Sequence, residues 1–82
     1  MERMRHEGVV AGLLRRPPGQ NLTMLDPRPL TRVRAVYGRA IATTSSHVLH
    51  EWRKAGQLHA RWDERWQVQR VNADVWDGEE LY

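Results

Sequence analysis

The chain has 82 residues, with thirteen Lys or Arg against ten Asp or Glu and no cysteine. This length allows a single small domain, and the absence of cysteine excludes disulfides and thiolate metal sites, so apolar packing must supply the stability. No apolar run reaches the roughly 18 residues that a membrane span needs, and no secretory signal is recognisable. We therefore expect a cytoplasmic protein.

The charge is unevenly distributed along the chain. Residues 1–71 contain all thirteen bases and six acids, whereas residues 72–82 contain four acids and no base. A basic body favours a polyanionic partner, and twelve of the bases are Arg, whose planar guanidinium suits phosphate and guanine. We predict a folded domain over 1–71, followed by an acidic C-terminal tail over 72–82.

Two helices are expected in the first half of the chain. Residues from about 2 to 16 form the first, because their apolar residues recur at helical spacing and prolines follow. Asp26-Pro27 has the pattern of a helix start. From there the second helix runs to about residue 41, with an amphipathic stripe made of Leu30, Val33, Val36, Tyr37, Ala40 and Ile41.

A third helix is expected from about Thr44 to Ala55, closed by Gly56 as the residue after its C-terminus. The period then changes from 3.6 to 2 between Leu58 and Val71, which predicts two strands. A three-residue loop, Asp63-Glu64-Arg65, would place Trp62 opposite Trp66 on one face of a hairpin. The predicted class is therefore α+β, with three helices followed by a two-stranded β-hairpin.

This order of elements resembles the winged helix-turn-helix family. The local similarity lies in residues 44–58 and in Arg61-Trp62-Asp63-Glu64-Arg65-Trp66. These stretches are similar to the recognition helix and wing of small ArsR-type repressors and of phage excisionase or MerR-like modules. The resemblance implies sequence-specific binding of double-stranded DNA by a transcriptional regulator or recombination accessory protein, with helix 44–55 in the major groove and the wing 58–71 on the backbone.

The candidate DNA-binding residues lie in three groups. Residues at the start of the recognition helix and along its outer face would meet base edges and phosphates, those on the wing would reach the backbone or minor groove, and those on the second helix would cross the phosphates. They are, in that order, Thr44, Ser45, Ser46, His47, His50, Arg53 and Lys54; Arg61 and Arg65; and Arg28, Arg32 and Arg34.

Some of these residues have simpler interpretations. The arginines of the second helix fit an ordinary solvated face, and Trp62 with Trp66 fits cross-strand packing better than base stacking. Glu51 either accepts from cytosine or pairs with Lys54. Two histidines three residues apart, without cysteine, do not predict a metal site.

No cofactor is expected, and no catalytic constellation is apparent, so we do not expect an enzyme. The alternative function is a protein-interaction module that uses exposed tryptophans as anchors, namely Trp62, Trp66 and Trp76. A homodimer is also possible, with a contact through Val75, Trp76, Leu81 and Tyr82. Two tryptophan rings exposed together would favour protein binding, whereas His47, His50, Lys54 and the arginines on one face would favour DNA.

Overall fold

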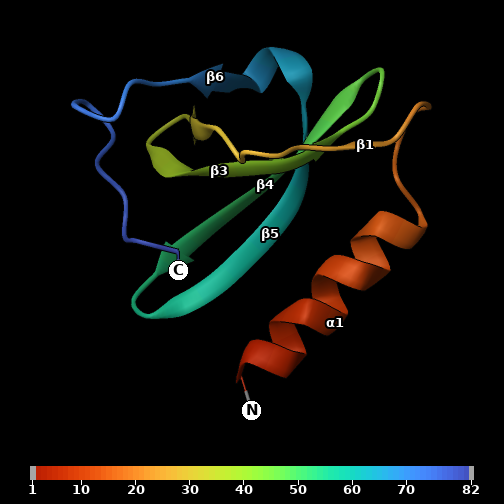
Figure 1. Cartoon of the computed structure of the whole chain (residues 1–82), viewed down its shortest axis with the longest axis horizontal. Coiled ribbons are helices and arrows are strands. Elements are labelled where there is room, and N and C mark those ends of the chain that lie inside the picture. The colour runs from red at the N-terminus through yellow and green to blue at the C-terminus, as the bar shows by residue number, and fades with distance from the viewer. Residues whose placement is uncertain (1, 82) are drawn as a thin grey trace.

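The computed structural model describes residues 2–81, with side chains from Arg5 onward. Within these residues there is one α-helix, and six antiparallel strands form a single sheet (Figure 1). The predicted winged helix-turn-helix is therefore wrong, since two of its three helices and the pairing of its wing are absent. The recognition helix over 44–55 and the wing over 58–71, which depend on that fold, are wrong with it.

The first helix is present where it was expected. α1 spans Glu2–Arg15, and Pro17 and Pro18 follow its C-terminus. Val10, Leu13 and Leu14 lie half-buried on the side of α1 that packs against the sheet. The helix therefore uses the apolar stripe that its sequence displays.

The second predicted helix is a β-hairpin. β2 (Leu30–Val33) and β3 (Val36–Thr43) pair antiparallel around a two-residue turn at Arg34 and Ala35. The stretch is rich in β-branched residues, whose stiff side chains favour strands over helices. Asp26-Pro27, expected to begin a helix, is a cis peptide in the loop before β2.

The third predicted helix is also a strand. β4 (His47–Lys54) contains four consecutive buried residues, 48–51, because both of its faces are covered, and this removes the alternation by which strands are recognised. Ala55 and Gly56, expected to end a helix, instead form the turn to β5 (Gln57–Glu64). Both have positive φ, 51° and 79°, as a two-residue type I′ hairpin turn requires.

The predicted wing pairs differently from the expectation. β5 pairs with β4, where Trp62 lies opposite Leu49, and the chain then passes through the 3-10 turn η1 (Arg65–Gln67) to β6 (Val68–Arg70). β6 pairs with β2. The predicted Trp62–Trp66 pair is wrong, and Trp66 is 77% exposed.

The order of the strands requires a curled sheet. The order is β5-β4-β3-β2-β6, and the short β1 (Thr23–Met24) pairs with the far end of β3. β5 and β6 lie at opposite edges, although only the three residues of η1 connect them. The sheet must therefore bend until its edges approach one another, and Figure 1 shows β6 and part of β3 above the twisted β4–β5 ribbon.

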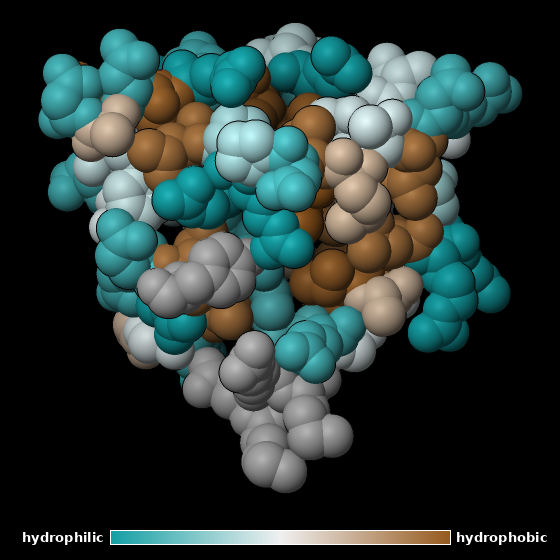
Figure 2. All heavy atoms as spheres, viewed as in Figure 1, coloured by the Kyte–Doolittle hydropathy of each residue, from teal (hydrophilic) through white to brown (hydrophobic). Residues whose placement is uncertain are grey.

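The apolar core lies between α1 and the sheet. A β-bulge in β3 directs both Ile41 and Ala42 to the side of Leu49, and these three fully buried residues form its centre. Trp62 closes one side and donates its indole N–H to the carbonyl of Leu13 at 3.0 Å. Figure 2 shows apolar atoms gathered along the junction of α1 with the sheet.

The last residues pack against their own chain. The tail, here residues 72–81, runs back toward the turn between β4 and β5 (Figure 1). Trp76 is half-buried and Leu81 is 2% exposed, whereas Val75 is 57% exposed. Two members of the suggested dimer contact are thus occupied within the chain, and Tyr82 lies outside the described residues.

Candidate functional site

The predicted start of the recognition helix is a tight turn between β3 and β4. Thr44 is 2% exposed; its hydroxyl donates to the carbonyl of Pro18 at 2.6 Å and accepts the backbone N–H of His47 at 3.0 Å. Ser45 and Ser46 are exposed beside it. Thr44 therefore fixes the turn, and no helix N-terminus is present here to meet DNA.

The predicted groove face is divided between the two sides of β4. His47 and His50 are three residues apart in a strand, so they point to opposite faces. His50 is fully buried, and Lys54 is exposed at the end of the strand. Arg53 is occupied by backbone carbonyls, with contacts of 2.8–2.9 Å to those of Gly56, Glu80 and Leu81.

The remaining predicted arginines do not share one surface. Arg28 lies 3.6 Å from a carboxylate oxygen of Glu51, and Arg65 donates to the carbonyl of Thr44 at 3.0 Å. Arg32 donates to the side chain of Gln69 on β6, and Arg34 is exposed in the turn between β2 and β3. The single DNA surface expected from the sequence is therefore not formed.

Aromatic and basic side chains do converge on one face of the β4–β5 hairpin. The ring of Trp52 stacks on that of His50, with centroids 5.5 Å apart, and on that of His59, with centroids 5.4 Å apart. The guanidinium carbon of Arg61 lies 5.2 Å from the centre of the Trp52 ring. We call Trp52, His59 and Arg61 the stacking platform; His59 and Arg61 are exposed, and Trp52 is half-buried.

A hollow of about 440 Å³ adjoins the stacking platform where α1 passes β5. Its lining includes Arg5, His6 and all three platform residues, and the described residues that line it include no carboxylate. Lys54 lies two residues beyond Trp52 on the same strand face and extends the positive charge. The Arg61 charge is partly balanced by Asp63, whose carboxylate lies 2.9 Å from its Nε atom.

His50, beneath the platform, is buried as a neutral side chain. Burial lowers its pKa from 6.5 to about 4, with nearby Arg61 acting in the same direction, while Asp63 and Glu51 oppose the shift. Among the described residues, neither ring nitrogen has a partner that meets hydrogen-bond geometry, and the same holds for the Thr31 hydroxyl and one carboxylate oxygen of Asp63. His50 therefore supports the Trp52 ring by contact and carries no charge at neutral pH.

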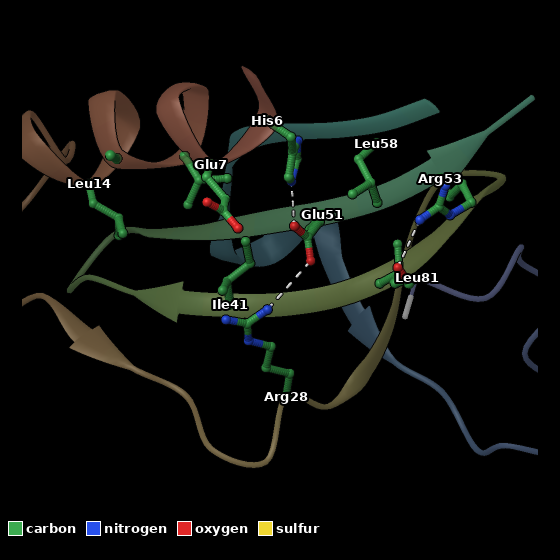
Figure 3. A pocket seen from close by; sticks show the side chains of 11 residues that line it. His6, Glu7, Leu14, Arg28, Ile41, Glu51, Arg53, Leu58 and Leu81 are labelled. Carbon is green, nitrogen blue, oxygen red and sulfur yellow. Dashed lines mark hydrogen bonds and ion pairs between the residues drawn. The ribbon is translucent and has the colours of Figure 1, made fainter. Parts of the chain in front are cut away.

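A second hollow of about 690 Å³, the helix–sheet pocket, lies between α1, the sheet and the tail. At its centre the Nε2 atom of His6 lies 2.5 Å from Oε2 of Glu51, and Arg28 approaches the same carboxylate (Figure 3). Apolar side chains form most of the remaining wall, namely Val10, Ala11, Leu14, Ile41, Leu58 and Leu81.

Sequence reasoning missed this buried polar cluster. A helix over 44–55 predicts that Glu51 faces outward, but Glu51 is 3% exposed, and no motif in the sequence marks His6 as a site residue. The two are 45 residues apart, so no local pattern joins them. The signal available was a charged residue two positions after Leu49 and directly before Trp52, both of which are large apolar residues.

Among the described residues, no group of three or more His, Cys, Asp or Glu is placed to hold a metal. No helix in this part of the chain is long and apolar enough to cross a membrane. Comparison with protein families, curated proteins and solved structures finds no match to this sequence.

Proposed function

We propose that this protein binds single-stranded nucleic acid through the stacking platform and the hollow beside it. The observation that carries the proposal is the Trp52 ring, stacked against two histidines with Arg61 over it, at the edge of a hollow lined by bases and by no described acid. This is the combination of aromatic face and positive charge that unpaired bases and their phosphates require.

The order of the three stacked rings, His50, Trp52 and His59, indicates that a nucleic-acid base would stack on His59. His50 is buried and Trp52 is half-buried, so each of them is packed within the hairpin face, whereas His59 is exposed. A base that stacks on His59 would continue the row His50–Trp52–His59. Arg5, Lys54 and Arg61 would then meet the phosphates on either side of that base.

The single strand is favoured over the duplex by the nature of these contacts. A base inside a double helix offers only its edge in a groove, and the helix expected to read such edges is absent. An unpaired base offers its flat face, and stacking on an aromatic side chain is worth about 1–3 kcal/mol per base. The platform presents ring faces and cations, and so it matches the unpaired form.

The test is fluorescence anisotropy with a labelled 20-nucleotide strand of mixed sequence, as RNA and as DNA, and with its duplex. We expect the single strand to bind more tightly than the duplex, and binding to weaken as salt rises. Replacing His59→Ala should weaken binding about tenfold through lost stacking. Arg61→Gln should weaken it too, and should reduce the salt slope by about 0.7.

Arg70→Gln is the matched control for charge. Arg70 is exposed on β6 and is neither part of the stacking platform nor among the residues that line the hollow, so its loss should leave affinity nearly unchanged. Absence of binding at low salt would refute the proposal. An equal loss in Arg70→Gln and Arg61→Gln would show non-specific attraction, and tighter duplex binding would exclude the single strand as the ligand.

A further inference from the structure

The tail is held by three separate contacts along the β3–β5 region. Trp76 donates its indole N–H to the carbonyl of Gly38 at 3.0 Å. The two carboxylate oxygens of Glu79 accept the backbone N–H groups of Ala55 and Gly56, at 3.1 and 3.3 Å. Leu81 is buried against the helix–sheet pocket. We call the surface that receives these three side chains the tail groove.

Arg53 donates hydrogen bonds to the main chain of the tail. Its Nε atom donates to the carbonyl of Glu80 and its Nη2 atom to that of Leu81, both at 2.9 Å. Figure 3 shows Arg53 beside Leu81 at one end of the helix–sheet pocket. Main-chain hydrogen bonds combined with pockets for individual side chains are one of the ways in which protein surfaces recognise extended peptides.

The groove is larger than its present occupant. With Leu81 in place, a hollow of about 690 Å³ remains beside it, walled by Leu14, Ile41 and Leu58 among others. A cavity of this size with mostly apolar walls falls within the range of ligand-binding pockets. The Leu81 subsite therefore has space for a bulkier apolar side chain.

We propose that the tail groove is a peptide-recognition surface and that its own tail is an intramolecular ligand that a peptide in trans can replace. The partner is an acidic peptide with the pattern of residues 76–81: Trp, then Gly, Glu and a bulky apolar residue at the second, third and fifth positions after it. The Glu is specified by the two N–H groups of the β4–β5 turn, and the apolar residue by the pocket.

Glycine is required at the position of Gly78. A Cβ atom there would lie 2.7 Å from the Trp76 ring and 3.0 Å from the Cβ of Tyr37. A side chain at this point would separate the Trp and Glu contacts. The need for glycine therefore adds to the three side-chain contacts of Trp76, Glu79 and Leu81. An acidic peptide with apolar residues but no glycine at this position would not fit the tail groove.

The attached tail competes with any free peptide. A ligand tethered by a short flexible segment acts at an effective concentration in the millimolar range, so a free peptide binds weakly while the tail is in place. Weakening the attached tail, without altering the groove, should expose the groove to the free peptide. This competition distinguishes recognition of a ligand from simple packing of residues 72–81 against the sheet.

The test measures anisotropy of a labelled synthetic peptide of residues 72–81 with the full chain. We expect weak binding to the wild type and binding about tenfold tighter to Leu81→Ser, because the serine weakens the attached tail but leaves the groove intact. Val75→Ser makes a similar change at an exposed position and should leave binding at the wild-type level. Adding Arg53→Gln to Leu81→Ser should abolish the gain.

Variants of the peptide test its proposed pattern against the Leu81→Ser chain. Phe at position 81 should bind more tightly, and Ala at position 78 or Gln at position 79 more weakly. If Leu81→Ser unfolds by circular dichroism, Glu79→Gln in the chain replaces it, with the same expected gain. Peptide binding that is no tighter to the folded variant than to the wild type, or that is unchanged by Arg53→Gln, would overturn the proposal.

Discussion

The Nε2 atom of His6 lies 2.5 Å from the Oε2 atom of Glu51, so one buried pair joins the helix to the middle of the sheet. The two side chains are 9% and 4% exposed. Loss of His6 would leave the buried carboxylate with Arg28 at 3.6 Å, a more distant and more exposed partner, and weakening the compensation of a buried charge is costly even where the intact pair adds little.

We predict that His6→Leu lowers the free energy of unfolding by about 3 kcal/mol. The double variant His6→Leu with Glu51→Gln should lose less than the two single variants together, because the second change removes the buried carboxylate that has lost its nearest partner. Urea unfolding of the four proteins measures this coupling. Strictly additive losses would show that the pair does not act as a unit.

Gly38→Ala should prevent folding or destabilise the protein severely. A Cβ atom at this position would lie 2.0 Å from the backbone carbonyl oxygen of Glu51 and 2.9 Å from the His50 ring, so β3 and β4 would have to separate. Gly12→Ala is the control, because Gly12 is exposed on α1 and a Cβ atom there would meet no described atom within 4 Å outside the neighbouring backbone of its own helix. It should stabilise the helix by up to about 1 kcal/mol. Thermal unfolding of both variants provides the comparison, and a mild effect of Gly38→Ala would contradict the close approach of the strands.

The low pKa of His50 predicts loss of stability in acid. Its pKa is about 4 in the folded protein and 6.5 as the unfolded reference, so between these values the unfolded chain binds more protons. The stability is therefore complete above pH 6.5 and falls as the pH decreases to 4. The shift corresponds to about 3 kcal/mol over the whole window.

His50→Gln isolates this contribution. The variant is expected to be less stable at pH 7, because the stacking on Trp52 is lost, but its stability should fall less steeply between pH 6.5 and 4. Urea unfolding at half-unit pH steps yields both slopes. Parallel curves for the two proteins would exclude His50 as the titrating group.

Trp62→Phe should loosen the contact of α1 with β5. The ring stays apolar, but the hydrogen bond to the carbonyl of Leu13 is lost, at a cost of about 1 kcal/mol. Hydrogen exchange of the α1 amides is expected to become faster. Trp66→Phe serves as the control, since that ring is 77% exposed and should contribute little. Equal effects of the two substitutions would argue against an anchoring role for Trp62.

Local signals in the sequence were sufficient for some elements. The apolar spacing of α1 and the prolines after it predicted the helix, and the two-residue period predicted strand character between Leu58 and Trp62. Both signals arise within a few neighbouring residues. In each of these segments the secondary structure favoured by the residues also places the apolar side chains on the face that becomes buried.

The stripe from Leu30 to Ile41 was misread because two interruptions shift the alternation of its strands. The turn at Arg34 and Ala35 changes the phase once, and the bulge at Ile41 changes it again, so the apolar residues fall at intervals that look helical. In β4 the covering of both faces removed the period altogether. Gly56 is compatible with a helix end and with a hairpin turn alike, and its position in the fold decides between them.

The sequence by itself thus determined α1, the strand character of β5, the basic body and the acidic tail. The tertiary structure decided the partners of the strands and the location of every candidate site. The stack of Trp52 with His59 depends on the register of β4 with β5, and the pairing of His6 with Glu51 spans 45 residues. Contacts at such separations follow from how the whole sheet curls to bury its apolar surface, and no short stretch of sequence contains that information.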